Sequence, residues 1–180
     1  MFFQNIEFHE TENFQYLLIH KNACSSVLKA IEHLNPKRTQ IKSNTKIKWT
    51  VIRDPYDRFI AGLKYDLKRH NVKLTDIDID ELFNSYINIY SRPDGHVNHC
   101  ASQFTHIINS DINFYVDIKD LEVFLKMHFN RSFYLNKDNE KDSLNLEKKE
   151  IMKYLNFDYY MYNTILNSNN LWKWYNGKIF

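Results

Sequence analysis

The stretch YLLIHKNACSSVLKAI, Tyr16 to Ile31, decides how the fold is interpreted, because it passes from an apolar strand into an amphipathic helix. We expect the strand over Gln15–Ile19 and the helix over Ser25–Leu34. Four apolar residues lie on the inner face of this helix: Val27, Leu28, Ile31 and Leu34. The polar turn HKNACSS between them contains neither a glycine nor a Walker pattern. It nevertheless leads into a helix start, which offers unpaired N–H groups and the positive end of the helix dipole to an anion.

Small side chains let the backbone of this turn approach a ligand, and Lys21 adds a mobile positive charge. Ser25 and Ser26 are able to cap the helix and to donate hydroxyl hydrogen bonds. The plainer interpretation is an ordinary serine N-cap beside a surface lysine, and this stretch alone favours it. The candidate anion-binding residues of the turn are Lys21, Asn22, Ala23, Cys24, Ser25 and Ser26.

A second strand, Lys48–Ile52, leads into VIRDPYDRFIAGL and a helix over Tyr56–Arg69. Arg53 leaves this strand at its carboxyl end, where a guanidinium grips a phosphate with two parallel hydrogen bonds. Asp54 and Arg58 are four residues apart, which suits an ion pair at a helix start. A purely structural ion-pair cluster explains Arg58 well. It explains less well why a lysine and an arginine both follow strands.

The remaining chain continues the alternation of strands and helices. NFYVDI, residues 113–118, is a third strand, and RPDGHVNHCASQ, residues 92–103, is a loop with two histidines. Further helices are expected over Asp80–Tyr90, Leu121–His128, Leu146–Leu155 and Asp158–Leu166, and the aromatic stretch 167–180 packs on the body. This pattern predicts a single α/β domain over residues 1–180, with three layers and a mainly parallel sheet flanked by helices. Ligands of such sheets bind beyond the carboxyl ends of the strands.

Composition limits the classes of function. Of the 180 residues, 43% are hydrophobic and 16% aromatic, which excludes a disordered chain. A net charge of +2 does not indicate a nucleic-acid binder, and it fits an anionic small ligand. Cys24 and Cys100 form neither a disulfide framework nor a metal site by spacing, so we expect a cytoplasmic protein. We expect no signal peptide and no membrane insertion, because no basic segment precedes an apolar one and no apolar run is long enough.

Both turns resemble motifs of the sulfotransferases that use 3′-phosphoadenosine-5′-phosphosulfate (PAPS). IHKNACSS resembles their 5′-phosphosulfate loop, Ile-Pro-Lys-Asn-Ala-Cys/Gly-Thr-Ser, and VIRDPYDRFIAGL resembles their 3′-phosphate motif. The match is to the carbohydrate (type 2) branch. HCASQ, YVDIKDLEVF and IMKYLNFDYYMY are similar to later segments of that branch, and YLNKD is similar to the family's Leu-Asn-Lys-Ser. The resemblance runs in order along the chain from about Tyr16 to Tyr162.

The resemblance implies a P-loop-NTPase-like sulfotransferase fold and transfer of a sulfuryl group from PAPS to a hydroxyl of a carbohydrate or small metabolite. It implies that Lys21 and the amides of residues 22–26 neutralise the leaving phosphate. It also implies that Arg53, helped by the backbone near Ala61, holds the 3′-phosphate. Asn136 and Lys137 are further donor-site candidates. Because the transferred group carries less negative charge than a phosphoryl group, no metal ion is implied.

A histidine is the expected base. His99 matches the family's His-x-x-x-Gln spacing with Gln103, and His96 resembles the base of the 2-O-sulfotransferases. We favour His99, with His96 as the alternative and His20 as a third candidate. The sequence also departs from the family pattern: His20 replaces a proline, Ser25 a threonine, and Ala61 a serine whose hydroxyl usually holds the 3′-phosphate.

Two other functions stay open. One is a non-catalytic nucleotide-binding relative, which the departures at His20 and Ala61 favour. The other is a nucleotide or nucleoside kinase on a similar scaffold, against which the sequence lacks Gly-Lys-Ser/Thr and a clear Mg²⁺-binding aspartate after a strand. The sequence does not predict the oligomeric state.

Overall fold

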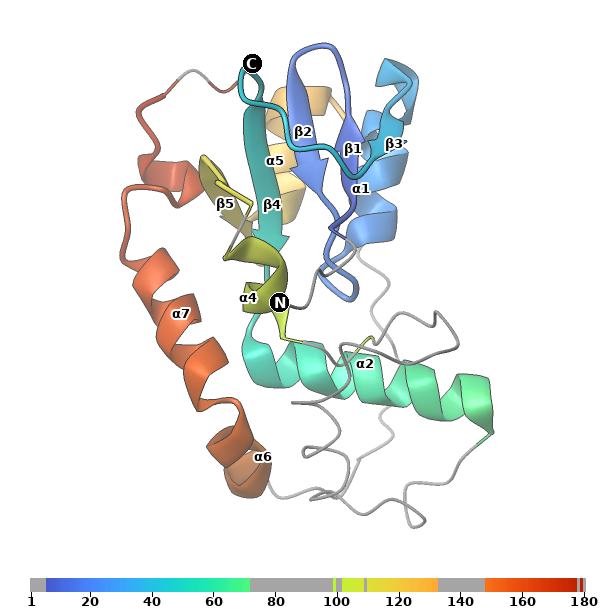
Figure 1. The fold of residues 1–180 in the computed structure, drawn as a ribbon, viewed down its shortest axis with the longest axis vertical. Helices are drawn as coiled ribbons and strands as arrows, with labels where there is room; N and C mark the ends of the chain where they lie inside the picture. Colours follow the sequence, from blue (N-terminus) through green and yellow to red (C-terminus); the bar gives the residue numbers. More distant parts are fainter. Residues whose placement is uncertain are drawn as a thin grey trace.

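The computed structural model describes residues 6–71, 99, 102–108, 110–132, 148–177 and 179. Within this described part, five strands form one sheet in the order β3-β1-β2-β4-β5 (Figure 1). The strands are β1 Phe8–Glu10, β2 Phe14–Leu17, β3 Lys37–Thr39, β4 Ile47–Ile52 and β5 Phe114–Asp117.

The sheet is mixed, so the expectation of a mainly parallel sheet is wrong. β4 pairs in parallel with β2 and β5, whereas β1 pairs antiparallel with both β2 and β3. Only residues 11–13 connect β1 to β2, while a parallel crossover needs a dozen or more. Thr11 closes this hairpin, because its N–H donates to the Phe14 carbonyl over 2.9 Å and its Oγ1 accepts from the Phe14 N–H over 3.2 Å. The resemblance implied a P-loop-NTPase-like sulfotransferase fold with a mainly parallel sheet, so that expectation is wrong as well.

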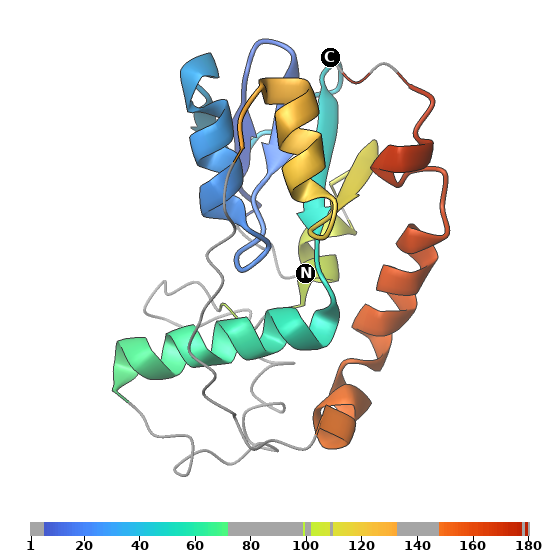
Figure 2. The same cartoon turned by 180° about the vertical axis from the view of Figure 1, so that it is seen from behind.

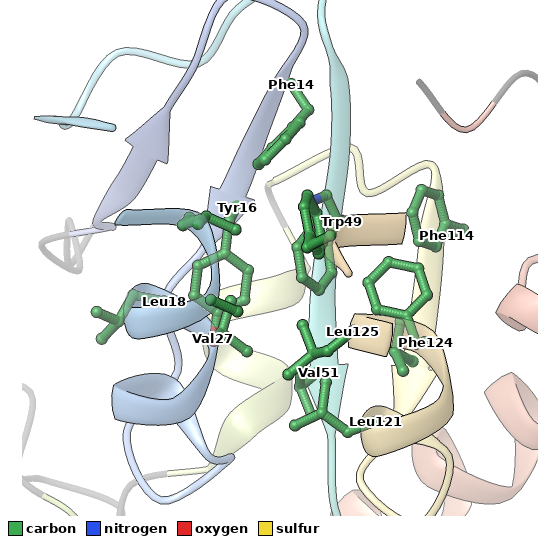
Figure 3. Packing of buried hydrophobic residues seen from close by; sticks show 14 residues of the cluster. Phe14, Tyr16, Leu18, Val27, Trp49, Val51, Phe114, Leu121, Phe124 and Leu125 are labelled. Carbon is green, nitrogen blue, oxygen red and sulfur yellow. The ribbon is translucent and has the colours of Figure 1, made fainter. Parts of the chain in front are cut away.

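One face of the sheet is covered by α1 (Cys24–Ile31) and α5 (Leu121–Phe129) (Figures 2 and 3). Because side chains alternate along a strand, every second residue of β2, β4 and β5 contributes to this core. Trp49 of β4 is fully buried at its centre, with ring centroids 4.8 Å from Tyr16 and 4.9 Å from Phe124. These large aromatic side chains belong to the same buried cluster as residues of α1 and α5, and they pack both helices against the strands.

The opposite face is covered by α4 (Gln103–Ile107) and α7 (Asn156–Leu166) (Figure 1). Leu17, Ile52 and Tyr115 point to this side, where Phe104 of α4 and Tyr162 of α7 pack on them. None of the described helices combines the length and the apolar character needed to cross a membrane.

Helix α2 (Pro55–His70) lies across the carboxyl ends of β2 and β4 (Figures 1 and 2). Helix α6 (Lys148–Tyr154) contacts it, and two short 3₁₀ helices complete the described elements, η1 at Glu32–Leu34 and η4 at Trp172–Trp174. The carboxyl ends of β2 and β4 therefore face α2, the helix that follows β4 in the chain.

The expected helices over residues 56–69, 121–128 and 158–166 are confirmed as α2, α5 and α7, and the aromatic end of the chain packs on the core through Trp172 and Tyr175. The expected helix over residues 25–34 is shorter: α1 ends at Ile31, and Leu34 in η1 is 39% exposed, so its place on the inner face is wrong. The sequence predicts neither β1, β3 nor α4. The expected helix Asp80–Tyr90 lies outside the described residues, and the single domain over 1–180 stays a prediction.

Candidate functional site

The loop between β2 and α1 is held in an unusual backbone conformation. Lys21 has φ 65° and Ala23 φ 58°, both in the left-handed region. Ala23 is the N-cap of α1, and no side chain caps this helix. The expected capping by Ser25 or Ser26 is therefore wrong, because α1 begins at Cys24 and both serines lie inside its first turn. The Ser26 N–H donates to the Ala23 carbonyl over 3.0 Å, whereas the N–H groups of Cys24 and Ser25 have no acceptor within the described part of the chain.

Asn22 anchors this loop to β4 and to α4. Its side chain is fully buried, and Nδ2 donates to the carbonyl of Val51 over 2.7 Å and to Oε1 of Gln103 over 2.9 Å. Within the described part of the chain, Asn22 Oδ1 has no hydrogen-bond partner. The resemblance assigned Asn22 a role through its backbone amide, but its side chain is what fixes the loop to β4.

Gln103, at the start of α4, anchors the loop after β4 in the same way. Its Oε1 accepts from the Arg53 N–H over 3.1 Å, and its Nε2 donates to the Arg53 carbonyl over 2.7 Å. One buried glutamine thus pairs with both backbone groups of Arg53 as a neighbouring strand would. Because the same oxygen accepts from Asn22, Gln103 joins the two loops.

The loops carrying Lys21 and Arg53 are in direct contact. Arg53 Nη1 donates to the carbonyl of Lys21 over 3.2 Å. The two residues follow β2 and β4, which are neighbouring parallel strands. Their adjacent position is what the sequence predicts, whereas their role in holding a nucleotide stays a prediction.

An aromatic side chain of α2 connects Lys21 to His99. Lys21 Nζ lies 3.5 Å from the ring centroid of Tyr65, within the range of a cation–π contact. The ring centroids of Tyr65 and His99 are 4.3 Å apart. His99 is only 7% exposed, and its Nδ1 lies 2.7 Å from Oδ1 of Asp66. The positive charge of Lys21 and the imidazole of His99 therefore rest against the same ring.

His20 packs edge-on against His99, with ring centroids 5.1 Å apart. Burial, and then the neighbouring charges of His99 and Arg58, lower the pKa of His20 to about 4. His20 is consequently neutral near pH 7 and a weak base. It packs against His99, at the position where the motif that this turn resembles has a proline.

Asp54 lies at the start of α2, where it caps the helix, whereas the side chain of Arg58 is buried one turn later. Asp54 caps α2, with its side chain accepting from the Asp57 N–H over 3.1 Å, and it also accepts from the Tyr159 hydroxyl over 3.2 Å. Arg58 is 2% exposed, and its charge helps to lower the pKa of His20. Arg58 thus lies in the buried part of the site, close enough to His20 to act on its protonation.

Three candidates from the sequence lie outside the described residues: His96, Asn136 and Lys137. Cys100 does as well. Ala61 is on α2 and is half-buried. Among the described residues, no group of three or more His, Cys, Asp or Glu side chains is placed to hold a metal ion.

The sequence interpretation missed the side-chain roles of Tyr65 and Asp66. A signal for Asp66 was present, because Arg58, Gly62 and Asp66 recur every four residues and so lie on one face of α2. Charged residues on one face of the helix after the candidate ligand-binding turn are site candidates, but this pattern does not identify His99 as the partner of Asp66. Tyr65 had no comparable signal, since an exposed tyrosine is common on helices.

Comparison with known proteins adds no relative: no protein-family model matches the chain, and no curated protein and no solved structure is significantly similar to it.

Proposed function

We propose that this protein is a sulfotransferase that moves a sulfuryl group from PAPS to a hydroxyl of a carbohydrate or small metabolite. The observation that carries the proposal is the shared contact with Tyr65, which brings Lys21 of the β2–α1 loop beside His99. Sulfuryl transfer needs a cation at the leaving phosphate and a base at the attacking hydroxyl. The proposal rests on these side chains and on the motif resemblance, and it does not require a mainly parallel sheet.

The cations and N–H groups of the two loops fit the negative charges of PAPS. Lys21 and the N–H groups at the start of α1 offer positive potential for the 5′-phosphosulfate. Arg53 offers a guanidinium for the 3′-phosphate, and its backbone is fixed by Gln103. Cations on two adjacent loops suit a ligand with phosphates at both ends of one nucleoside.

The reaction balances with these groups. The acceptor oxygen attacks sulfur, the bond between sulfur and the bridging phosphate oxygen breaks, and the acceptor proton passes to a histidine. His99 takes that role in our proposal, with His96 as the alternative. Lys21 stabilises the negative charge that develops on the leaving 3′-phosphoadenosine-5′-phosphate, or PAP. We also propose a reducing, cytoplasmic location, in which the thiol of Cys24 stays free.

Ligand binding is the first test. Thermal-shift and calorimetric titrations should find that PAP stabilises the protein more than ATP with Mg²⁺. The Lys21→Ala variant should bind PAP at least tenfold more weakly, whereas Lys126→Ala, which removes an exposed lysine of α5, should bind it normally. A preference for ATP with Mg²⁺ would favour a kinase instead.

Turnover is the second test. Transfer of labelled sulfate from PAPS to a panel of glycans and small hydroxyl compounds should be abolished in Lys21→Ala. It should fall on the order of a hundredfold or more in His99→Ala. His33→Ala changes an exposed histidine and serves as the control. Tight binding of PAP without turnover on any acceptor would indicate a non-catalytic relative, and normal turnover in Lys21→Ala would refute the leaving-group role.

A further inference from the structure

His99 is held by a carboxylate that the proposed reaction has not used. Asp66 lies on α2, and its Oδ1 is 2.7 Å from His99 Nδ1. The side chains of His99 and Asp66 are 9% and 27% exposed, so water competes little for this contact. At this distance the two atoms share a hydrogen bond.

The chemistry of the pair fixes the direction of that hydrogen bond. An ionised carboxylate only accepts, and a neutral imidazole carries one N–H. The proton of neutral His99 must therefore sit on Nδ1 for the bond to form. The other ring nitrogen, Nε2, then keeps its lone pair and is the one able to take a proton.

The plane of the imidazole is fixed by its neighbours. Tyr65 contacts the His99 ring at 4.3 Å with an interplanar angle of 53°, and His20 meets it edge-on at 72°. Tyr65 is the residue next to Asp66 on α2, so one helical turn supplies both the hydrogen bond and a packing surface. A ring held in this way has little freedom to flip, so Nδ1 stays directed at Asp66.

We infer that Asp66 is a positioning residue that holds His99 in the Nδ1–H tautomer and keeps Nε2 as its basic nitrogen. The tautomer is a property of the folded protein, whereas its catalytic consequence rests on the proposed function. Neither the motif resemblance nor the spacing of the histidines points to Asp66. It is assigned from the contact alone.

Nitrogen NMR of the histidine side chains tests the tautomer without any substrate. At about pH 8, where imidazoles are mostly neutral, wild-type His99 should show a protonated Nδ1 and an unprotonated Nε2. Asp66→Ala should move the proton to Nε2, the form that free imidazole side chains favour. Asp57→Ala, which removes an exposed carboxylate from the same helix, should leave the wild-type pattern. A backbone amide spectrum verifies that each variant is folded.

The outcome for the wild type decides the inference even if Asp66→Ala does not fold. A wild-type His99 with its proton on Nε2 would overturn it, as would an unchanged tautomer in a folded Asp66→Ala protein.

Activity gives a separate readout. If the protein is a sulfotransferase, Asp66→Ala should lower kcat on the order of tenfold to a hundredfold while the KM for PAPS stays near the wild-type value. Equal kcat in the two proteins would overturn the positioning role. An inactive wild type would refute the proposed function instead, and the NMR result would still judge Asp66.

Discussion

Asn22 accounts for a turn that holds its shape without glycine. The residues on either side of it, Lys21 and Ala23, adopt left-handed backbone conformations, which cost about 1 kcal/mol each for residues with a Cβ atom. The buried amide of Asn22 offsets that cost by its hydrogen bonds to Val51 and Gln103. The turn is thus strained on both sides of one anchored residue.

We expect Ala23→Gly to raise the free energy of unfolding by about 0.5–1 kcal/mol, because glycine adopts the left-handed region without a steric cost. The matched control is Ala30→Gly in α1. Ala30 is fully buried in a helix, so its replacement should lower the free energy of unfolding by about 1 kcal/mol or more. Urea denaturation of the two variants measures both values. Equal destabilisation by the two substitutions would contradict the strain at Ala23.

At this scale the sequence predicts the positions of Lys21 and Arg53 but not what holds them. Both residues follow strands, and neighbouring parallel strands bring such residues together. The anchors depend on contacts between distant parts of the chain: Asn22 and Gln103 are 81 residues apart, and Asp66 and His99 are 33 apart. No local pattern encodes such pairings, so they follow only from the folded arrangement.

Among the elements, α2 has the clearest start. Asp54 accepts from the Asp57 N–H, Pro55 occupies the first turn, and Tyr159 of α7 donates to the same carboxylate. The cap thus also joins α2 to the helix that covers the far face of the sheet. Because Arg53 precedes Asp54, the start of this helix also sets where the Arg53 side chain emerges.

Replacing this cap should cost more than removing a nearby charge. We expect Asp54→Ala to lower the free energy of unfolding by about 1–2 kcal/mol, through loss of the cap and of the Tyr159 hydrogen bond. Asp57→Ala removes an exposed acidic residue from the same turn and should cost only a few tenths of a kcal/mol. Chemical denaturation of both variants measures the difference. If Asp57→Ala were the more damaging of the two, the charge of the turn would matter more than the cap.

The sequence predicts well those elements that are long enough to show a periodic pattern of apolar residues. α2 spans 16 residues with an apolar stripe and a proline at its start, and β4 spans six residues that are mostly buried. β1 and β3 have three residues each, too few for an alternation to be recognised. Missing β1 led directly to the wrong sheet, because both antiparallel pairings involve this strand.

At the scale of the whole molecule, burial and the charge of Arg58 keep two histidines neutral. Burial, followed by the charge of Arg58, lowers the pKa of His106 on α4 to about 3. Burial and the charges of His99 and Arg58 lower that of His20 to about 4, against an opposing influence of Glu7. Both start from an ordinary value of 6.5 in the unfolded chain. Between these values the unfolded protein binds more protons than the folded one.

Stability should therefore fall on acidification earlier than carboxylates alone would cause. The contribution of the neutral histidines is complete above about pH 6.5 and is lost progressively as the pH falls toward 4. Glu10, whose pKa the Lys46 ammonium lowers, adds its own loss only below its ordinary value of 4.5. In the window between these two regions the histidines with a lowered pKa take up protons, and they include His128, whose pKa burial also lowers.

The double variant His20→Gln/His106→Gln should make the pH dependence of unfolding shallower in that window, because neither replacement titrates and only His128 keeps its share. Urea denaturation at several pH values between 6.5 and 4.5 measures the slope, and His33→Gln, which changes an exposed histidine, should keep the wild-type slope. The comparison concerns slopes, so a uniform loss of stability in the double variant does not affect it. If the double variant lost stability on acidification as steeply as the wild type, the proton uptake would belong to other groups, and the neutral state of these two histidines would be wrong.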